Sequence, residues 1–169
     1  MTDAASFTGY VYPNETIIPW GVLIVIYPYL TGLVAGAFTV SSFYHVFGMQ
    51  QFKPVARLAL LTSLSVMLFV PVPLLVHLGH PERSYLSMVT PHLTSAFAMF
   101  GFFAAFYTIL LILECWFVFR PDNVVRAQNS SGLKRAFYRA VTLWSDDLSP
   151  RARLIDSKWL LTLAIVGIP

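Results

Sequence analysis

Charged residues are absent from three long stretches of the chain, and these stretches are almost entirely apolar. They span residues 16–52, 58–81 and 84–113. Each exceeds the roughly 20 apolar residues that a helix needs to cross a hydrocarbon core of about 30 Å. The pattern therefore predicts three transmembrane helices, at about 17–46, 55–78 and 92–118.

A fourth apolar run, WLLTLAIVGIP, occupies residues 159–169. It forms about 16 Å of helix at 1.5 Å per residue, which is roughly half of a bilayer. The pattern predicts an all-α integral membrane protein with three full transmembrane helices and the start of a fourth, incomplete helix. The alternatives are that a second polypeptide completes the bundle or that this segment is re-entrant.

The composition agrees with a chain that lies in a membrane. Hydrophobic residues make up 57% of the 169 residues and charged residues only 11%, whereas soluble domains carry about 25% charged residues. The N-terminal residues MTDAASFTGY contain no basic region, and the following apolar run is too long for a signal peptide. The chain therefore divides into an N-terminal segment (1–16), membrane helices (17–118), a loop (119–158) and the start of the fourth helix (159–169).

Basic residues mark one side of the predicted bundle. Lys53 and Arg57 lie in the first loop, and the segment 120–158 carries eight basic residues against four aspartates. The hairpin between the second and third helices has only Arg83. Because basic loops stay in the cytoplasm, this ten-to-one ratio predicts an extracytoplasmic N-terminus and a cytoplasmic loop at 119–158. Basic residues that lie next to membrane helices give no indication of nucleic-acid binding.

Within this loop, the run LKRAFYRAVTLW places apolar and basic residues on opposite sides of a helix. The apolar positions are Leu133, Phe137, Val141 and Trp144, and the basic ones are Lys134, Arg135 and Arg139. Such a pattern predicts an amphipathic helix that lies on the inner leaflet. A plain solvated helix is the alternative.

Small residues and prolines predict how the membrane helices pack. Gly32 and Gly36 in the first helix have a spacing that lets a neighbouring helix approach closely. Pro71 and Pro73 remove backbone donors from the second helix and bend it near its outer end. The freed carbonyls need protein or water partners, which predicts a polar cavity at that level, with an ordinary kink as the alternative.

Polar side chains gather at the outer boundary of the helices. We call this set the outer cluster: Glu15, Trp20, His77, His80, Glu82, Arg83, Tyr85 and His92. Interfacial anchoring explains any one of them alone. However, three of the four histidines of the chain fall within 16 positions on this one side, which favours a site.

Two kinds of redox chemistry fit the outer cluster. A quinone head group needs hydrogen-bonding and proton-exchanging groups beside an apolar slot, and histidine with a nearby carboxylate provides them. Alternatively, His77 and His92 could ligate a b-type haem from both faces, although the inner half offers only His45 for a second centre. The single Cys115 excludes an Fe–S or zinc site built from this chain alone.

Glu114 ends the third charge-free stretch, toward the inner side. It either marks the water boundary near Arg120 or begins an inward proton path with Thr62 and Ser63 of the second helix. Half of a transporter is a further alternative, but it would need buried ionisable residues near the midplane. The sequence places almost none there.

Three segments read IPWGVLIVIYPYLTGLVAGAF, VHLGHPERSYLSM and PHLTSAFAMFGFFAAFYTILL, followed later by DSKWLLTLAIVGIP. Together they resemble the NrfD/PsrC-like family of integral membrane subunits, which includes the membrane anchors of polysulfide reductase. The resemblance implies eight or more helices in two four-helix bundles, of which this chain would form the first. It also implies a quinone (menaquinone or ubiquinone) near the outer face and no haem or Fe–S cluster in this subunit. The family turn often has arginine where this chain has His80.

The resemblance further implies a quinone-interacting subunit of a respiratory complex in a bacterial or archaeal cytoplasmic membrane. It would have no activity alone, and would exchange electrons with a ferredoxin-like Fe–S subunit that serves a molybdenum enzyme or multihaem cytochrome, with accompanying proton translocation. We expect the quinone to be bound by His92, His77, Glu15, Trp20 and Tyr85. We expect the Fe–S partner to dock at His80, Glu82 and Arg83.

Overall fold

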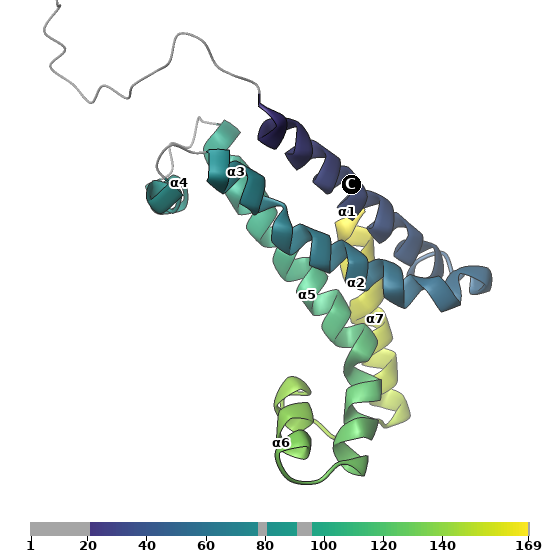
Figure 1. Cartoon of the computed structure of the whole chain (residues 1–169). Helices are drawn as coiled ribbons and strands as arrows, with labels where there is room; N and C mark the ends of the chain where they lie inside the picture. Colours follow the sequence, from purple (N-terminus) through teal and green to yellow (C-terminus); the bar gives the residue numbers. More distant parts are fainter. Residues whose placement is uncertain (1–20, 78–80, 91–95, 169) are drawn as a thin grey trace, which may run out of the picture.

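The computed structural model describes residues 21–77, 81–90 and 96–168, and these are helical with short connections. The elements in chain order are α1 (Val22–His45), η1 (Gln50–Phe52), α2 (Lys53–Phe69), α3 (Pro71–His77), η2 (Pro81–Arg83), α4 (Leu86–Val89), α5 (Ala96–Asn129), α6 (Gly132–Val141) and α7 (Pro150–Gly167). Figure 1 shows α1, α2, α5 and α7 packed together and α6 beside the far end of α5.

Three helices in the described residues are long and apolar enough to cross a membrane. They span Val22–His45, Gln50–His77 and Met99–Asn129. The predicted all-α membrane fold with three spans is therefore confirmed. We name the two ends of the bundle after the predicted orientation. The outer end is the one with Val22, His77 and Ala96, and the inner end is the one with His45, Lys53 and Asn129.

The two prolines of the second span lie where the helix is interrupted. α2 ends at Phe69 and α3 begins at Pro71, and the N–H of Val70 donates to the carbonyls of Val66 and Met67 at 3.1 and 3.3 Å. Proline has no N–H to continue the ladder, so the interruption falls at the predicted position. In contrast, α5 continues past the expected membrane boundary at 118 to Asn129, although Pro121 lies inside it.

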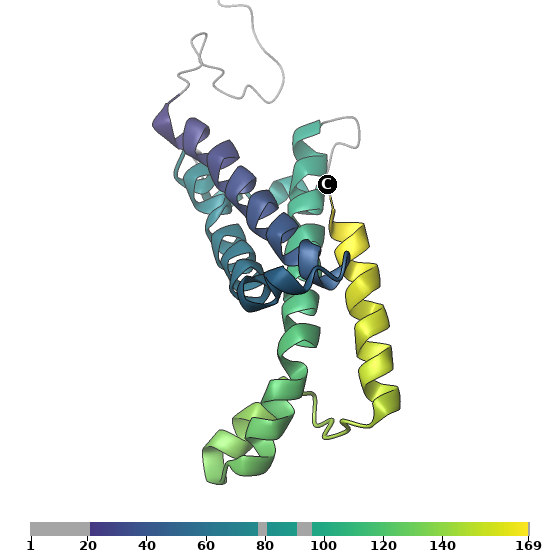
Figure 2. The ribbon, with the colours of Figure 1, turned by 90° about the vertical axis from the view of Figure 1, so that its right-hand side faces the viewer.

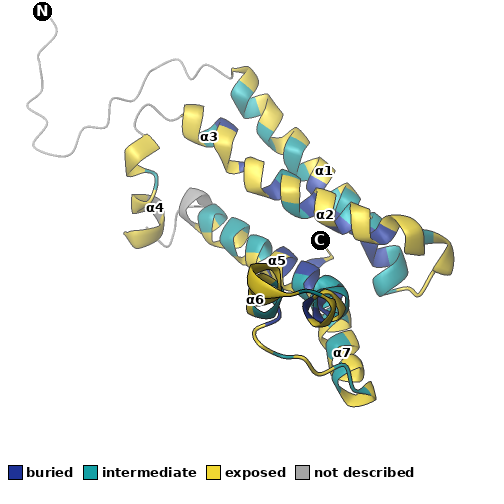
Figure 3. Ribbon diagram, turned by 60° about the horizontal axis from the view of Figure 1, so that its bottom comes forward, coloured by how far each residue is buried: buried dark blue, intermediate teal, exposed yellow. Residues whose placement is uncertain are grey.

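The core forms where α1, α2 and α5 meet. Its fully buried members include Phe38 of α1, Leu60 of α2 and Leu111 of α5, each at most 1% exposed. Figure 3 shows that the buried positions form stripes where helices face one another, while the opposite faces are exposed. Exposed apolar residues such as Leu58 and Phe103 lie on those faces, as expected for helices whose surroundings are lipid or other helices.

α7 packs tightly against α1 and α5 at Gly167. A Cβ atom there would lie 2.6 Å from Cζ of Phe38 and 2.9 Å from Cδ2 of Leu110, so any larger residue would force these side chains to shift. By contrast, a Cβ at Gly32 or Gly36 would meet nothing within 4 Å. The predicted close approach at these two glycines is therefore wrong for the described part of the chain, because the packed face of α1 is the one that carries Val34 and Phe38.

α7 begins at Pro150, well before the apolar run at 159, and runs beside the inner half of α5 (Figure 2). α6 packs against the end of α5, and its Leu133 and Phe137 side chains are exposed. These exposed apolar groups agree with an amphipathic helix. Its location on the inner leaflet stays a prediction.

Candidate functional site

Half of the outer cluster lies outside the described residues, namely Glu15, Trp20, His80 and His92. Of the other predicted quinone ligands, His77 is the last residue of α3 and Tyr85 precedes α4, and both side chains are exposed. The haem pairing of His77 with His92 also stays a prediction.

The two predicted docking residues that the structure describes are Glu82 and Arg83. Both belong to the short helix η2 at the outer end, and both are exposed. Their position leaves them accessible to a partner on that side. The structure therefore places four members of the outer cluster, all exposed near the outer end: His77, Glu82, Arg83 and Tyr85.

A small cavity lies just below the outer end, between α1, α2 and α5. Its volume is about 140 Å³, and it is lined mainly by apolar side chains. The lining residues are Thr31, Val34, Ala35, Met67, Val70, Phe100, Ala104 and Tyr107. A dry cavity of roughly 150 Å³ holds a benzene-sized ring. We therefore call it the ring-sized cavity; it lies at the level predicted from the prolines, although its walls are less polar than expected.

Tyr107 is the main polar group in the ring-sized cavity. Its hydroxyl is buried and has no hydrogen-bond partner among the described residues. Its ring lies 5.9 Å from that of Phe38, which belongs to the core. A buried hydroxyl without a partner costs free energy. The hydroxyl itself has almost no accessible surface, so a ligand in the cavity reaches it only when a neighbouring side chain shifts.

Glu114 lies two helical turns along α5 from Tyr107, toward the inner end. Its side chain is 3% exposed, and Oε1 has no hydrogen-bond partner in the described part of the chain. A carboxyl group inside an apolar bundle is a functional candidate, because burying it is expensive. The prediction that Glu114 only marks the water boundary is difficult to reconcile with this burial.

The other two residues of the predicted proton path occupy opposite sides of α2. Ser63 is fully buried and donates to the carbonyl of Val34 at 3.1 Å, across to α1. Thr62 is exposed and donates within its own helix to Leu58 at 2.9 Å. The structure thus places Ser63 and Glu114 in the interior of the bundle and Thr62 on the exposed surface of α2.

Sequence reasoning missed a polar face at the inner half of α1. Ser41 and Ser42 are each 3% exposed, and Nε2 of His45 is buried without a hydrogen-bond partner among the described residues. The signal was present, since residues three and four positions apart share one face of a helix. Such a polar face within a transmembrane helix points to the bundle interior.

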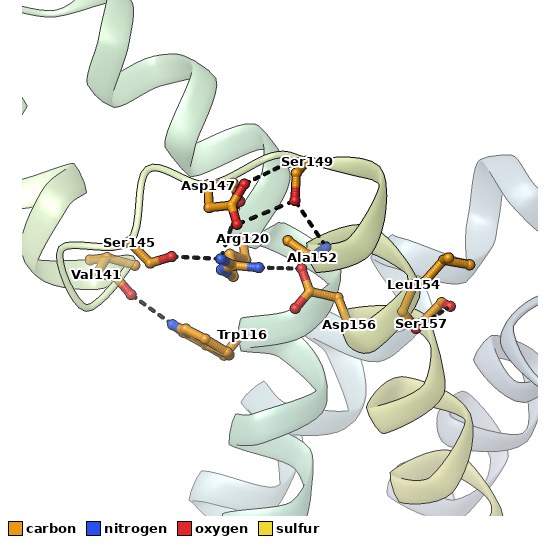
Figure 4. Close-up of polar contacts among 10 residues, drawn as sticks. All are labelled: Trp116, Arg120, Val141, Ser145, Asp147, Ser149, Ala152, Leu154, Asp156 and Ser157. Atoms are coloured by element: carbon orange, nitrogen blue, oxygen red, sulfur yellow. Dashed lines mark hydrogen bonds and ion pairs between the residues drawn. The ribbon is translucent and has the colours of Figure 1, made fainter.

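Sequence reasoning also missed a set of contacts around Arg120, which we call the inner network (Figure 4). The Arg120 side chain is 7% exposed and forms an ion pair with Asp156 of α7. It also donates to Oγ of Ser145 at 2.7 Å and to the carbonyl of Asp147 at 3.3 Å. One guanidinium therefore joins α5, α7 and the segment between α6 and α7.

Two further contacts complete the inner network. Nε1 of Trp116, whose ring lies 5.7 Å from the Arg120 guanidinium, donates to the carbonyl of Val141 at 2.7 Å. Ser149 caps α7 by accepting from the N–H of Ala152 at 3.2 Å. The backbone N–H of Ser149 donates to Asp147 and lowers the pKa of that exposed carboxyl. The contacts of the inner network hold α5, α7 and the segment between α6 and α7 together, although Nε of Arg120 has no hydrogen-bond partner among the described residues.

Metal binding has no support in the described residues, where no three His, Cys, Asp or Glu side chains lie close enough to share an ion. The sequence matches the NrfD family ("Polysulphide reductase, NrfD") over residues 12–166, which is most of the chain. The chain belongs to the NrfD family. With three membrane spans, this NrfD protein is a multi-pass membrane protein.

Two relatives have related names. Over 155 residues, the chain is 35% identical to a selenate reductase subunit of Mesobacillus selenatarsenatis, covering 89% of this chain and 36% of the relative. It is 26% identical to the "Putative dimethyl sulfoxide reductase membrane subunit" of Halobacterium salinarum, covering 92% of this chain and 33% of the relative. The chain thus spans about a third of the length of these relatives. No solved structure matches it.

Proposed function

We propose that this NrfD protein is a membrane subunit of a reductase complex and that it exchanges electrons between membrane quinones and an extracytoplasmic Fe–S subunit. The first part is supported by its family and by the names of its relatives, which are subunits of reductases. The second part is supported by the ring-sized cavity near the outer end.

The observation that carries the quinone proposal is a cavity of about 140 Å³ that is lined by Tyr107, whose buried hydroxyl has no hydrogen-bond partner among the described residues. The cavity matches the size of one six-membered ring, and Phe100 and Met67 supply apolar walls. Tyr107 would donate a hydrogen bond to a quinone carbonyl, which needs such a donor. When bound, a quinone supplies reversible two-electron, two-proton chemistry.

The outer cluster remains the proposed second half of this site. His77 follows Val70 of the cavity wall by two helical turns, or about 10 Å, at the outer end. We propose that His77, Tyr85, His92, Glu15 and Trp20 surround the mouth of the cavity and hold the polar side of the quinone. Histidine exchanges protons near neutral pH, so this rim would exchange protons with water.

We propose that the electron partner is a ferredoxin-like Fe–S subunit that docks at the outer end. His80, Glu82 and Arg83 would contact it, and a molybdenum enzyme or a multihaem cytochrome would complete the assembly. The exposure of Glu82 and Arg83 supports this arrangement.

Glu114 supports proton movement in the same subunit. We propose that it accepts protons from the inner side along a path that includes Ser63 and Thr62, and that Tyr107 extends the path outward. A buried carboxyl with an unpartnered oxygen can hold and release a proton without breaking an existing contact. Because Thr62 is exposed on the surface of the bundle, its substitution should affect proton movement least.

The experiment that tests the quinone proposal is the substitution Tyr107→Phe in the purified complex. Loss of one hydrogen bond should weaken binding of a quinone analogue about fivefold, measured by calorimetry, and should slow quinol oxidation. Tyr29→Phe is the control, because Tyr29 is 67% exposed on α1. Tyr107→Trp, which fills the cavity, should abolish binding. The proposal fails when both Tyr107 variants bind the analogue as the native complex does.

A further inference from the structure

A larger pocket opens at the inner end, where α1, α2, α5 and α7 come together. Its volume is about 690 Å³, within the range of about 300–1,000 Å³ that is typical of ligand sites. It lies at the opposite end of the bundle from the ring-sized cavity and the outer cluster. We call it the inner pocket, and no role described above uses it.

The inner pocket is positively charged. Lys53, Arg57 and Arg153 line it, against the single carboxylate of Asp156. That carboxylate is already engaged by Arg120 of the inner network. Arg57 pairs with Asp122 at 2.6 Å, with both side chains about half exposed.

Two of these cations have no counter-charge among the described residues. Lys53 and Arg153 form no ion pair within the described part of the chain. His45 also lines the pocket, but its Nε2 is buried and has no hydrogen-bond partner among the described residues. The pocket therefore presents positive charge from Lys53 and Arg153 to an anion.

The lining changes from charged to apolar with depth. Lys53 is the first residue of α2, and Arg153 lies in the first turn of α7. Leu160 lies two turns further along α7, about 10 Å deeper, and Val118 of α5 also lines the pocket. The pocket deepens from the inner end toward the core of the bundle, because α7 runs from Pro150 to Gly167, which packs against Phe38 in the core.

We propose that the inner pocket binds an anionic phospholipid of the inner leaflet. Lys53 and Arg153 bind the phosphodiester, and one acyl chain lies against Val118 and Leu160. Basic pockets between membrane helices suit such head groups. A free phosphate would use the cations but leave the apolar walls without a partner. The proposal does not depend on quinone binding.

The test uses native mass spectrometry of the full chain, purified in mild detergent with the subunits that accompany it. Phosphatidylglycerol is titrated in parallel with phosphatidylcholine of the same chain length and with inorganic phosphate. We expect one phosphatidylglycerol to remain bound to each chain at concentrations at which the other two do not bind. Lys53→Gln combined with Arg153→Gln should weaken this binding tenfold or more, because two basic contacts are lost.

The matched control is Lys134→Gln with Arg135→Gln, which removes the same charge from exposed positions of α6. It should leave lipid binding unchanged, and Lys53→Arg with Arg153→Lys should preserve it. Ser157→Trp, which fills the pocket from the α7 wall without changing charge, should also displace the lipid. Equal weakening by both charge-removing variants would overturn the proposal. So would equal binding of phosphatidylcholine, or displacement of the lipid by equimolar phosphate.

Discussion

The two ends of the helical bundle differ in how far their polar side chains are buried. At the inner end, Arg120 is buried and bonded to α7 and to the segment between α6 and α7. At the outer end, the described members of the outer cluster, such as His77 and Tyr85, are exposed. The comparison teaches that the buried polar residues of the inner network hold the chain together, whereas the exposed ones of the outer cluster are accessible to other molecules.

The difference has an energetic basis. Removing one member of a buried ion pair leaves an unpaired charge and costs far more than changing an exposed residue. Substitutions in the inner network should therefore reduce stability, whereas substitutions in the outer cluster should change function with little loss of stability. The predictions below test this separation, from the largest expected effect to the smallest.

Arg120→Ala should have the largest effect. It removes the partner of Asp156 and two further hydrogen bonds, and loss of one partner of a buried pair costs about 3–5 kcal/mol. The free energy of unfolding, measured by denaturant titration in detergent, should fall by that amount. Arg126→Ala, on the exposed side of the same helix, is the control and should change it by less than about 0.5 kcal/mol. Equal losses from the two variants would refute a special role for the inner network.

Trp116→Phe should have a smaller effect at the same end. The phenyl ring keeps most of the packing but cannot donate to the carbonyl of Val141, and an acceptor left without its donor costs about 1–2 kcal/mol. The same denaturant titration measures the loss. Trp159→Phe should be nearly neutral, because Trp159 is 55% exposed. If the two tryptophan variants were equally stable, the indole hydrogen bond would not contribute to the fold.

The membrane spans could be predicted from sequence, whereas the inner network could not. A span depends on the length of an apolar run, which is a local property, so the three spans were found. Arg120 and Asp156 are 36 positions apart, and their pairing depends on where α7 begins and how it turns back along α5. In the sequence, Arg120 was only one of several basic residues that set the orientation.

The glycines also show that contacts between helices could not be predicted from sequence spacing alone. The spacing of Gly32 and Gly36 shows that a helix can approach but not whether one does, and in the described fold nothing fills that space. The close approach occurs instead at Gly167, a single glycine without any spacing signal. For the candidate site, the burial of Glu114 and Tyr107 depends on which face of α5 meets α1 and α2. Periodicity is weak in a helix that is apolar on all sides.

Asp147→Asn tests the exposed edge of the inner network through its pH dependence. The Ser149 N–H favours the charged carboxylate, so the pKa of Asp147 in the folded protein lies below its ordinary value of 3.8. Its contribution to stability is therefore complete above that ordinary value and is lost as the pH falls through the lowered pKa. The variant should be slightly less stable than the native protein at pH 7, and this difference should shrink toward pH 3. A constant difference in the unfolding midpoint would show that the charge contributes nothing.

His77→Gln should have the smallest effect on stability and is the sharpest test of the comparison. His77 is exposed at the end of α3, so the free energy of unfolding should stay within about 0.5 kcal/mol of the native value. Glutamine keeps a hydrogen-bonding group but cannot carry a proton as an imidazole does, so quinol oxidation by the complex should slow. An unfolding free energy as low as that of Arg120→Ala would mean that the outer end is held by its own polar contacts, as the inner end is. An unchanged rate would remove His77 from the proposed quinone site while leaving Tyr107 in it.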